Sequence, residues 1–184
     1  ASVTSGATLN IGNGISVANA VTINGAGAAG NNGALVGIGA TGTVSGNITL
    51  GSNATIATAG GGTALTTSGT TSGAFALTYA GAGSITVSNT ISTPTSITAN
   101  NTLTALNINT ATVTSTGTQT YNSPITLGAA TVTFTTTNSA ATFAAITNGT
   151  ARNMTVSTGS GAISLSGNVG TGTALSAIVL NSTG

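Results

Sequence analysis

The sequence is almost devoid of ionisable side chains. Its 184 residues include one Lys or Arg and no Asp, Glu, His or Cys, so that only 1% of the chain is charged. General acid–base catalysis requires a side chain whose pKa can be placed near the working pH. The many Ser and Thr hydroxyl groups have no side-chain base to activate them as nucleophiles. We therefore expect that the chain is not an enzyme and needs no cofactor.

The same absences argue against metal and nucleic-acid sites. Transition metals bind imidazole, thiolate or carboxylate groups, and calcium binds poorly without a negative ligand. The one basic residue, Arg152, cannot neutralise a row of phosphates, so we expect no nucleic-acid partner. We interpret Arg152 as a solvated loop residue that begins a strand, with a specific anionic contact as the alternative. The chain also lacks a run of about 18 apolar residues, and we expect no transmembrane helix.

What the sequence does contain favours β-structure throughout. Thr, Val and Ile are frequent, and such β-branched side chains pack well on a pleated sheet. Gly and Asn separate the apolar segments at turn-like sites such as Asn13-Gly14 and Asn148-Gly149. The spacing predicts about fifteen short strands. Apolar residues also alternate with period two, which indicates half-buried strands. The alternating sets are Leu9/Ile11, Ile15/Val17, Val21/Ile23, Ile48/Leu50, Phe75/Leu77/Tyr79, Ile85/Val87, Ile125/Leu127, Val132/Phe134, Met154/Val156, Ile163/Leu165 and Ile178/Leu180.

Three all-β architectures compete for this pattern: a sandwich, a closed barrel and a solenoid. A sandwich or barrel of this size has a wide interior that aromatic side chains usually fill, and this chain has three Phe, two Tyr and no Trp. The narrower interior of a solenoid suits stacked Val, Ile, Leu, Ala and Thr. Segments 15–27, 44–56, 121–134 and 163–180 also share a degenerate scheme of strand, small turn and strand. We therefore predict an all-β fold, a parallel β-solenoid (β-helix) with rungs of roughly 20 residues.

The prediction covers residues 1–184 as a single solenoid domain, which is either a whole protein or a segment of a longer fibrous one. Such a chain would make about eight or nine rungs and a rod roughly 40 Å long, because strands stack at about 4.8 Å.

Five segments share one style of Thr-, Gly- and Asn-rich alternation: TYNSPITLGAATVTFTTT (120–137), MTVSTGSGAISLSGNVG (154–170), ALSAIVLNSTG (174–184), ATLNIGNGISVANAVTING (7–25) and GTVSGNITLGSNATI (42–56). In these segments the chain resembles secreted filamentous-haemagglutinin-like exoproteins and autotransporter passenger domains. The resemblance implies a right-handed parallel β-helix that is secreted to the cell surface of a Gram-negative-type bacterium and serves as an adhesin or surface fibre. Passengers of this kind carry scattered Asp and Lys. The absence of Asp and Lys here favours a chain that is part of an assembly.

The open ends of a solenoid point to self-association. Natural proteins protect such edges with charged residues or Pro, and this chain has only Pro94 and Pro124 for that purpose. Near-zero net charge also removes the repulsion between copies. Head-to-tail contacts do not close, so they produce an open filament. We expect a structural subunit of an extracellular filament whose partner is another copy of itself, with lateral bundling through rows of Thr, Ser and Asn.

Two alternatives remain open. An array of Thr-x-Thr motifs on a β-solenoid can order water and bind ice if the motifs lie in register on nearly every rung; otherwise the Thr residues are ordinary strand surface. An adhesin segment could instead bind host or glycan surfaces, with Tyr79 and Tyr121 as stacking platforms; otherwise both rings are buried. The Thr-x-Thr motifs lie at 112–114, 114–116, 131–133 and 133–135.

Overall fold

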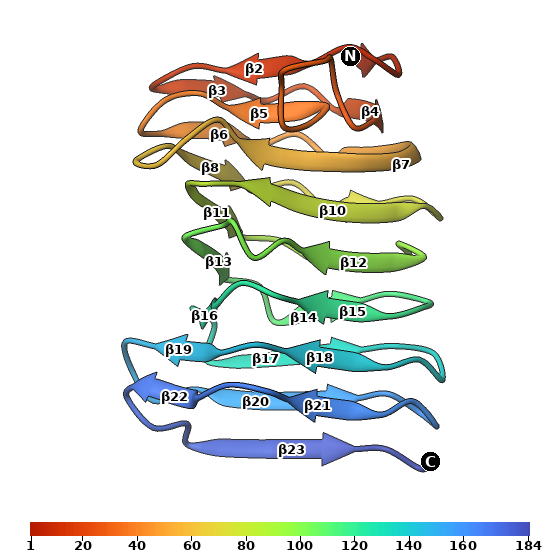
Figure 1. Ribbon diagram of the computed structural model, residues 1–184, viewed down its shortest axis with the longest axis vertical. Helices are drawn as coiled ribbons and strands as arrows, with labels where there is room; N and C mark the ends of the chain where they lie inside the picture. Colours follow the sequence, from red (N-terminus) through yellow and green to blue (C-terminus); the bar gives the residue numbers. More distant parts are fainter.

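The computed structural model describes residues 1–184 as β-strands joined by turns, with no helix, and confirms the predicted parallel β-solenoid. Each turn of the chain forms one rung, and a complete rung presents three faces. Strands on the same face pair in parallel with the rungs above and below. The chain makes about 8 turns with rungs of about 22 residues, slightly longer than predicted. The winding is right-handed: strands in front run to the left while the chain descends and returns behind (Figure 1).

Three columns of strands make up the three faces. The first face contains β1 (Ser2–Val3), β4 (Val21–Gly25), the first part of β7 (Ile48–Thr58), β9 (Thr71–Ser72), β14 (Thr112–Thr114), β17 (Thr131–Thr135), β20 (Asn153–Ser157) and β23 (Ala177–Asn181). Isolated bridges at Ile91 link β9 to β14. The second face contains β2 (Leu9–Ile11), β5 (Leu35–Gly37), the second part of β7, β10 (Ala76–Gly81), β12 (Ser96–Ala99), β15 (Gln119–Tyr121), β18 (Ala141–Phe143) and β21 (Ile163–Leu165).

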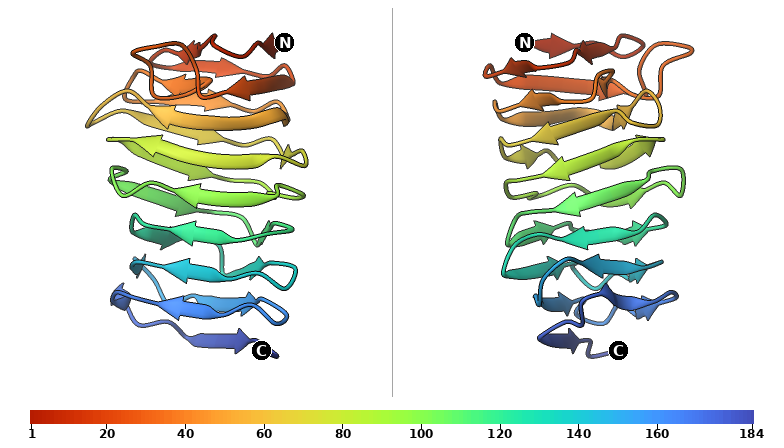
Figure 2. Two further views of the ribbon diagram at one scale, coloured as in Figure 1. Left: turned by 45° about the vertical axis from the view of Figure 1, so that its right-hand side comes forward. Right: turned by 90° about the vertical axis from the view of Figure 1, so that its left-hand side faces the viewer.

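The third face contains β3 (Ile15–Val17), β6 (Gly42–Val44), β8 (Ala64–Thr67), β11 (Ser84–Val87), β13 (Ala105–Ile108), β16 (Ile125–Leu127), β19 (Ile146–Asn148) and β22 (Val169–Gly172). Figure 2 shows how the strands lie one above another along the axis. Strand β7 runs through a corner and thereby joins the first two faces into one hydrogen-bonded sheet. Most rungs are regular, but residues 26–34 form a longer loop beside the first rung, where the Thr8 hydroxyl donates to the Gly33 carbonyl.

The interior is a continuous stack of apolar side chains. On the third face, Ile85 pairs with Leu65 in the rung before and with Leu106 in the rung after, and all three are fully buried. Their neighbours along the strand point outwards, as the alternating pattern predicts. A single cluster of 33 buried residues runs through the solenoid. Because burial of one Ile or Leu side chain contributes about 1.5–3 kcal/mol, this stack is the main source of stability.

Aromatic rings fill part of this interior. Tyr121 and Phe143 lie in paired positions on β15 and β18, and their rings stack with centroids 5.1 Å apart. Phe134, on the first face, meets both rings edge-on. Phe75 is the exception: it is 39% exposed and lies before β10, so the prediction that it belongs to the strand with Leu77 and Tyr79 is wrong. Gly73 has a φ of 123° and bends the chain there, which places Phe75 at a corner.

The structure has 23 strands, more than the fifteen or so predicted. The additional strands are only two to four residues long, and several contribute a single large apolar residue to the interior, as Val113 does in β14. A lone inward residue produces no alternating pattern, so such strands escape a search for period-two apolar pairs.

A polar group is buried beside the aromatic cluster. The Gln119 amide nitrogen donates to the carbonyl oxygens of Thr135 (2.8 Å) and Val113 (3.3 Å). The Tyr121 hydroxyl donates to Gln119 Oε1 at 2.9 Å. Tyr79 is also fully buried, yet its hydroxyl group has no hydrogen-bond partner. The two buried tyrosines therefore differ in whether burial of the hydroxyl group is compensated by a hydrogen bond.

This difference predicts opposite effects for the same substitution. Tyr121→Phe leaves Gln119 Oε1 without its donor and should lower the free energy of unfolding by about 1–2 kcal/mol, whereas Tyr79→Phe removes an uncompensated hydroxyl and should raise it by about 1 kcal/mol. Urea unfolding followed by circular dichroism measures both variants. Equal destabilisation by the two changes would contradict the described hydrogen bonding.

Candidate functional site

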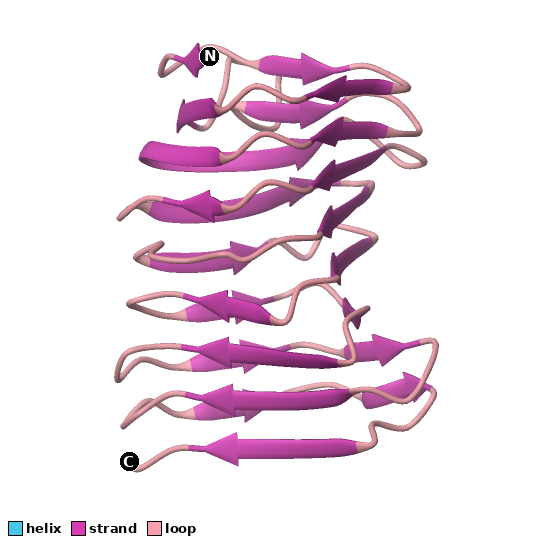
Figure 3. Cartoon of the chain, turned by 180° about the vertical axis from the view of Figure 1, so that it is seen from behind, coloured by secondary structure: helices cyan, strands magenta, loops and turns pink.

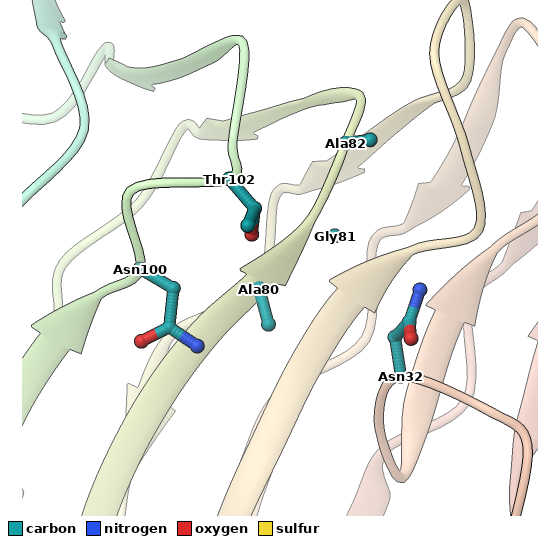
Figure 4. Close-up of a pocket in the computed structure, with 6 residues that line it drawn as sticks. All are labelled: Asn32, Ala80, Gly81, Ala82, Asn100 and Thr102. Atoms are coloured by element: carbon teal, nitrogen blue, oxygen red, sulfur yellow. The ribbon is translucent and has the colours of Figure 1, made fainter.

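The one marked hollow lies at the corner between the second and third faces. It is an open depression of about 430 Å³, lined by Ala80, Gly81, Ala82, Asn100, Thr102 and Asn32 from the long loop (Figure 4). One hydrogen bond of the Asn32 amide group is directed away from a ligand, because its Nδ2 donates to the carbonyl oxygen of Thr58 at 3.3 Å. Small-molecule sites typically combine an apolar, often aromatic lining with a few convergent polar groups. This hollow has neither an aromatic nor a charged side chain, and we assign it no ligand.

The tyrosine side chains do not form a surface platform. Tyr79 and Tyr121 are 0% and 1% exposed, so the interpretation of their rings as glycan-stacking sites is wrong and the alternative, that both are buried, is confirmed. Burial raises the pKa of both phenols well above the ordinary value, and the charge of Tyr79 adds to the effect at Tyr121. Both hydroxyl groups therefore stay protonated, and neither ring is accessible to a ligand.

Arg152 lies immediately before β20, which confirms its predicted place at the start of a strand. It is half-buried rather than fully solvated. Its carbonyl accepts a hydrogen bond from the Ser176 amide (2.8 Å), while its buried Nε atom has no partner. The chain contains no acidic side chain that could pair with the guanidinium group.

The Thr-x-Thr motifs come together on the first face. Thr112 pairs with Thr133, and Thr133 pairs with Thr155. A parallel row runs through Thr114, Thr135 and Ser157. The two rows lie on β14, β17 and β20, in the lower half of the face seen from behind (Figure 3). We call these six residues the hydroxyl grid; its hydroxyl-bearing side chains repeat at about 4.8 Å across strands and about 6.6 Å along them.

A second row of hydroxyl groups lies on the second face, where sequence analysis did not single it out. We call it the Thr ladder: Thr55, Thr78, Thr98, Thr120, Thr142 and Ser164, paired in this order on consecutive rungs. The residues are 20 to 23 positions apart in the sequence, and the spacing is irregular. Only the strand register brings them into line. The sequence signal for the Thr ladder is a Thr or Ser that recurs once per rung, and only a repeat search that tolerates variable turn lengths could have detected it.

Apolar surface is concentrated on the terminal rungs. Of the seven large apolar residues that are exposed, Ile15 lies on the first rung, and Val169, Ile178, Val179 and Leu180 lie on the last two. Ile178 and Leu180 pair with Met154 and Val156, which are fully buried, and therefore point towards the solenoid axis. A further rung placed against β23 would cover these two side chains.

The described residues contain no cluster of three or more His, Cys, Asp or Glu that could hold a metal ion. The structure offers no helix with the length and apolar character needed to cross a membrane. In comparisons with known proteins, no family model, no curated protein and no solved structure matches the chain.

Proposed function

We propose that the chain is a structural segment of an extracellular fibre in which solenoid segments stack end to end. The observation that carries the proposal is the in-register parallel stack, whose terminal rung presents the inward-facing Ile178 and Leu180 for a further rung to cover. The backbone groups at such an edge favour addition of another parallel strand. The resemblance to secreted β-helix exoproteins supports a location at the surface of a Gram-negative-type bacterium.

The two prolines do not protect the first or the last rung of residues 1–184. Pro94 precedes β12 and Pro124 precedes β16, so both lie in the middle rungs. Their carbonyl groups accept hydrogen bonds from Thr116 and Leu106 and are part of the regular stack. No charged side chain lies on either terminal rung. The usual barriers to edge-to-edge association are therefore missing, and end-to-end contacts of this kind extend into a filament rather than a closed ring.

We predict that the purified 184-residue chain forms filaments visible by electron microscopy. Ile178→Lys places a charge in the apolar interior of the end contact and should leave the protein monomeric in sedimentation. Val179→Lys adds the same charge to the outward side of the same strand and should still polymerise, because Val179 pairs with outward-facing Thr155. A wild-type chain that sediments as a monodisperse monomer at high concentration would refute end-to-end assembly.

A second candidate function is binding of ordered water or ice by the hydroxyl grid. The favouring observation is register on three consecutive rungs, not on nearly every rung: Thr112, Thr133 and Thr155 stack directly on one another, next to Thr114 and Thr135. A rigid sheet holds these hydroxyl and methyl groups at regular spacings. No corresponding observation favours the glycan-binding alternative, because both tyrosine rings are buried.

For this second function we predict a measurable thermal hysteresis of the freezing point. Thr133→Lys should abolish it by disrupting the centre of the hydroxyl grid. Thr66→Lys, an outward substitution on the third face, should leave it unchanged. A wild-type protein without thermal hysteresis would exclude ice binding and leave the fibre proposal unaffected.

A further inference from the structure

The second face is the most uniform surface of the solenoid. From β7 to β21 its strands pair without a register shift, and each contributes one residue to the Thr ladder. The outward residues on both sides of the ladder are Ala, Ser, Thr and Asn. No outward side chain on this stretch is aromatic, charged or long. The second face therefore presents small side chains that repeat regularly along six consecutive rungs.

We propose that this face is the lateral contact between neighbouring fibres, formed by the second faces of two copies of this chain. The inference rests on the proposed fibre function and names the surface through which fibres would bundle. Stacked rows of identical small side chains interdigitate in dry interfaces between paired sheets. Because the face carries no charge, the approach of two identical faces meets no electrostatic repulsion. The Thr ladder of one copy would lie in the shallow groove between two outward columns of the other.

The area of the second face explains why a stable lateral contact requires several segments stacked in a fibre. Six rungs spaced by about 4.8 Å, with about four residues of 3.3 Å rise each, give roughly 380 Å² per copy. A stable complex buries about 800 Å² per partner. One segment therefore supplies about half of the required area, and two segments stacked end to end supply all of it. Repetition along a rod strengthens the contact further, because each later segment binds in an intramolecular manner.

The other two faces are less suited to this contact. On the third face, outward groups bond to one another: the Thr126 and Thr147 hydroxyl groups are 2.9 Å apart, and Asn107 Nδ2 donates to Thr86 Oγ1. Its pairing also contains a register shift at Ile146/Thr147. On the first face, the register shifts between β4 and β7. Between β9 and β14 the pairing is reduced to isolated bridges at Ile91. The third face also pairs without a shift from β3 to β19, so the second face is distinguished by its outward hydroxyl row, which has no such bonds between side chains.

The test compares two variants that add the same charge to different faces. Thr98→Lys places an ammonium group at the middle of the Thr ladder, and Thr66→Lys places one on the third face at an equally half-buried, outward position. We expect wild type and Thr66→Lys to form bundles with an equatorial spacing of about 10 Å between sheets. Thr98→Lys should form single, unbundled filaments. Equal urea midpoints would show that both variants keep the fold.

The outcomes separate this inference from the fibre proposal. Bundling by all three proteins, or loss of bundling in both variants, would overturn the second-face contact while filaments remained. If wild type forms no filaments, the fibre proposal fails, and small-angle scattering at rising concentration then tests the face directly. An attraction between monomers that Thr98→Lys removes and Thr66→Lys keeps would support the contact. An equal attraction in all three would overturn it.

Discussion

The vertical stacking of inward side chains is the constraint on which the rest of this structure depends. Ile85 lies between Leu65 and Leu106 in the stack. A shift of one residue in either pairing would point the apolar side chains of that strand to solvent and its polar side chains into the core. The same register determines the outer surface. When Ile97 stacks on Leu77, the neighbouring Thr98 must stack on Thr78. The Thr ladder and the hydroxyl grid are thus consequences of the alignment of the core.

Much of the architecture could be predicted from the sequence because alternation survives in single strands. Pairs such as Ile85/Val87 mark inward positions without any knowledge of their neighbours. The surface rows could not be predicted, since turns of variable length hide the register: Leu106 pairs with Ile125 after 19 residues, and Val156 pairs with Leu180 after 24. The two tyrosines differ in how far the sequence predicts their burial. Tyr79 continues the alternation that begins with Leu77, whereas Tyr121 has no apolar residue two positions away, so alternation cannot place it on either side of its strand.

The lack of charge gives the surface an unusual combination of properties. Rows of Thr, Ser and Asn keep the outside hydrated, while the near-zero net charge leaves no long-range repulsion between copies. Sheets in most soluble proteins are kept apart by charged residues at edges and faces. In the proposed fibre, shape and strand register rather than charge would determine which surfaces come into contact. These contacts would form at the ends of the rod and along its second face.

The central claim, that stacking without electrostatics holds the fold together, is tested most directly by the free energy of unfolding as a function of pH and salt. No acidic or His side chain titrates, so the account predicts constant stability from about pH 3 to pH 9 and little change with NaCl concentration. Burial raises the pKa of Tyr79 and Tyr121 in the folded state, so unfolding releases their protons more readily and stability should fall only above about pH 10. Loss of stability in acid, or a strong dependence on salt, would contradict the account.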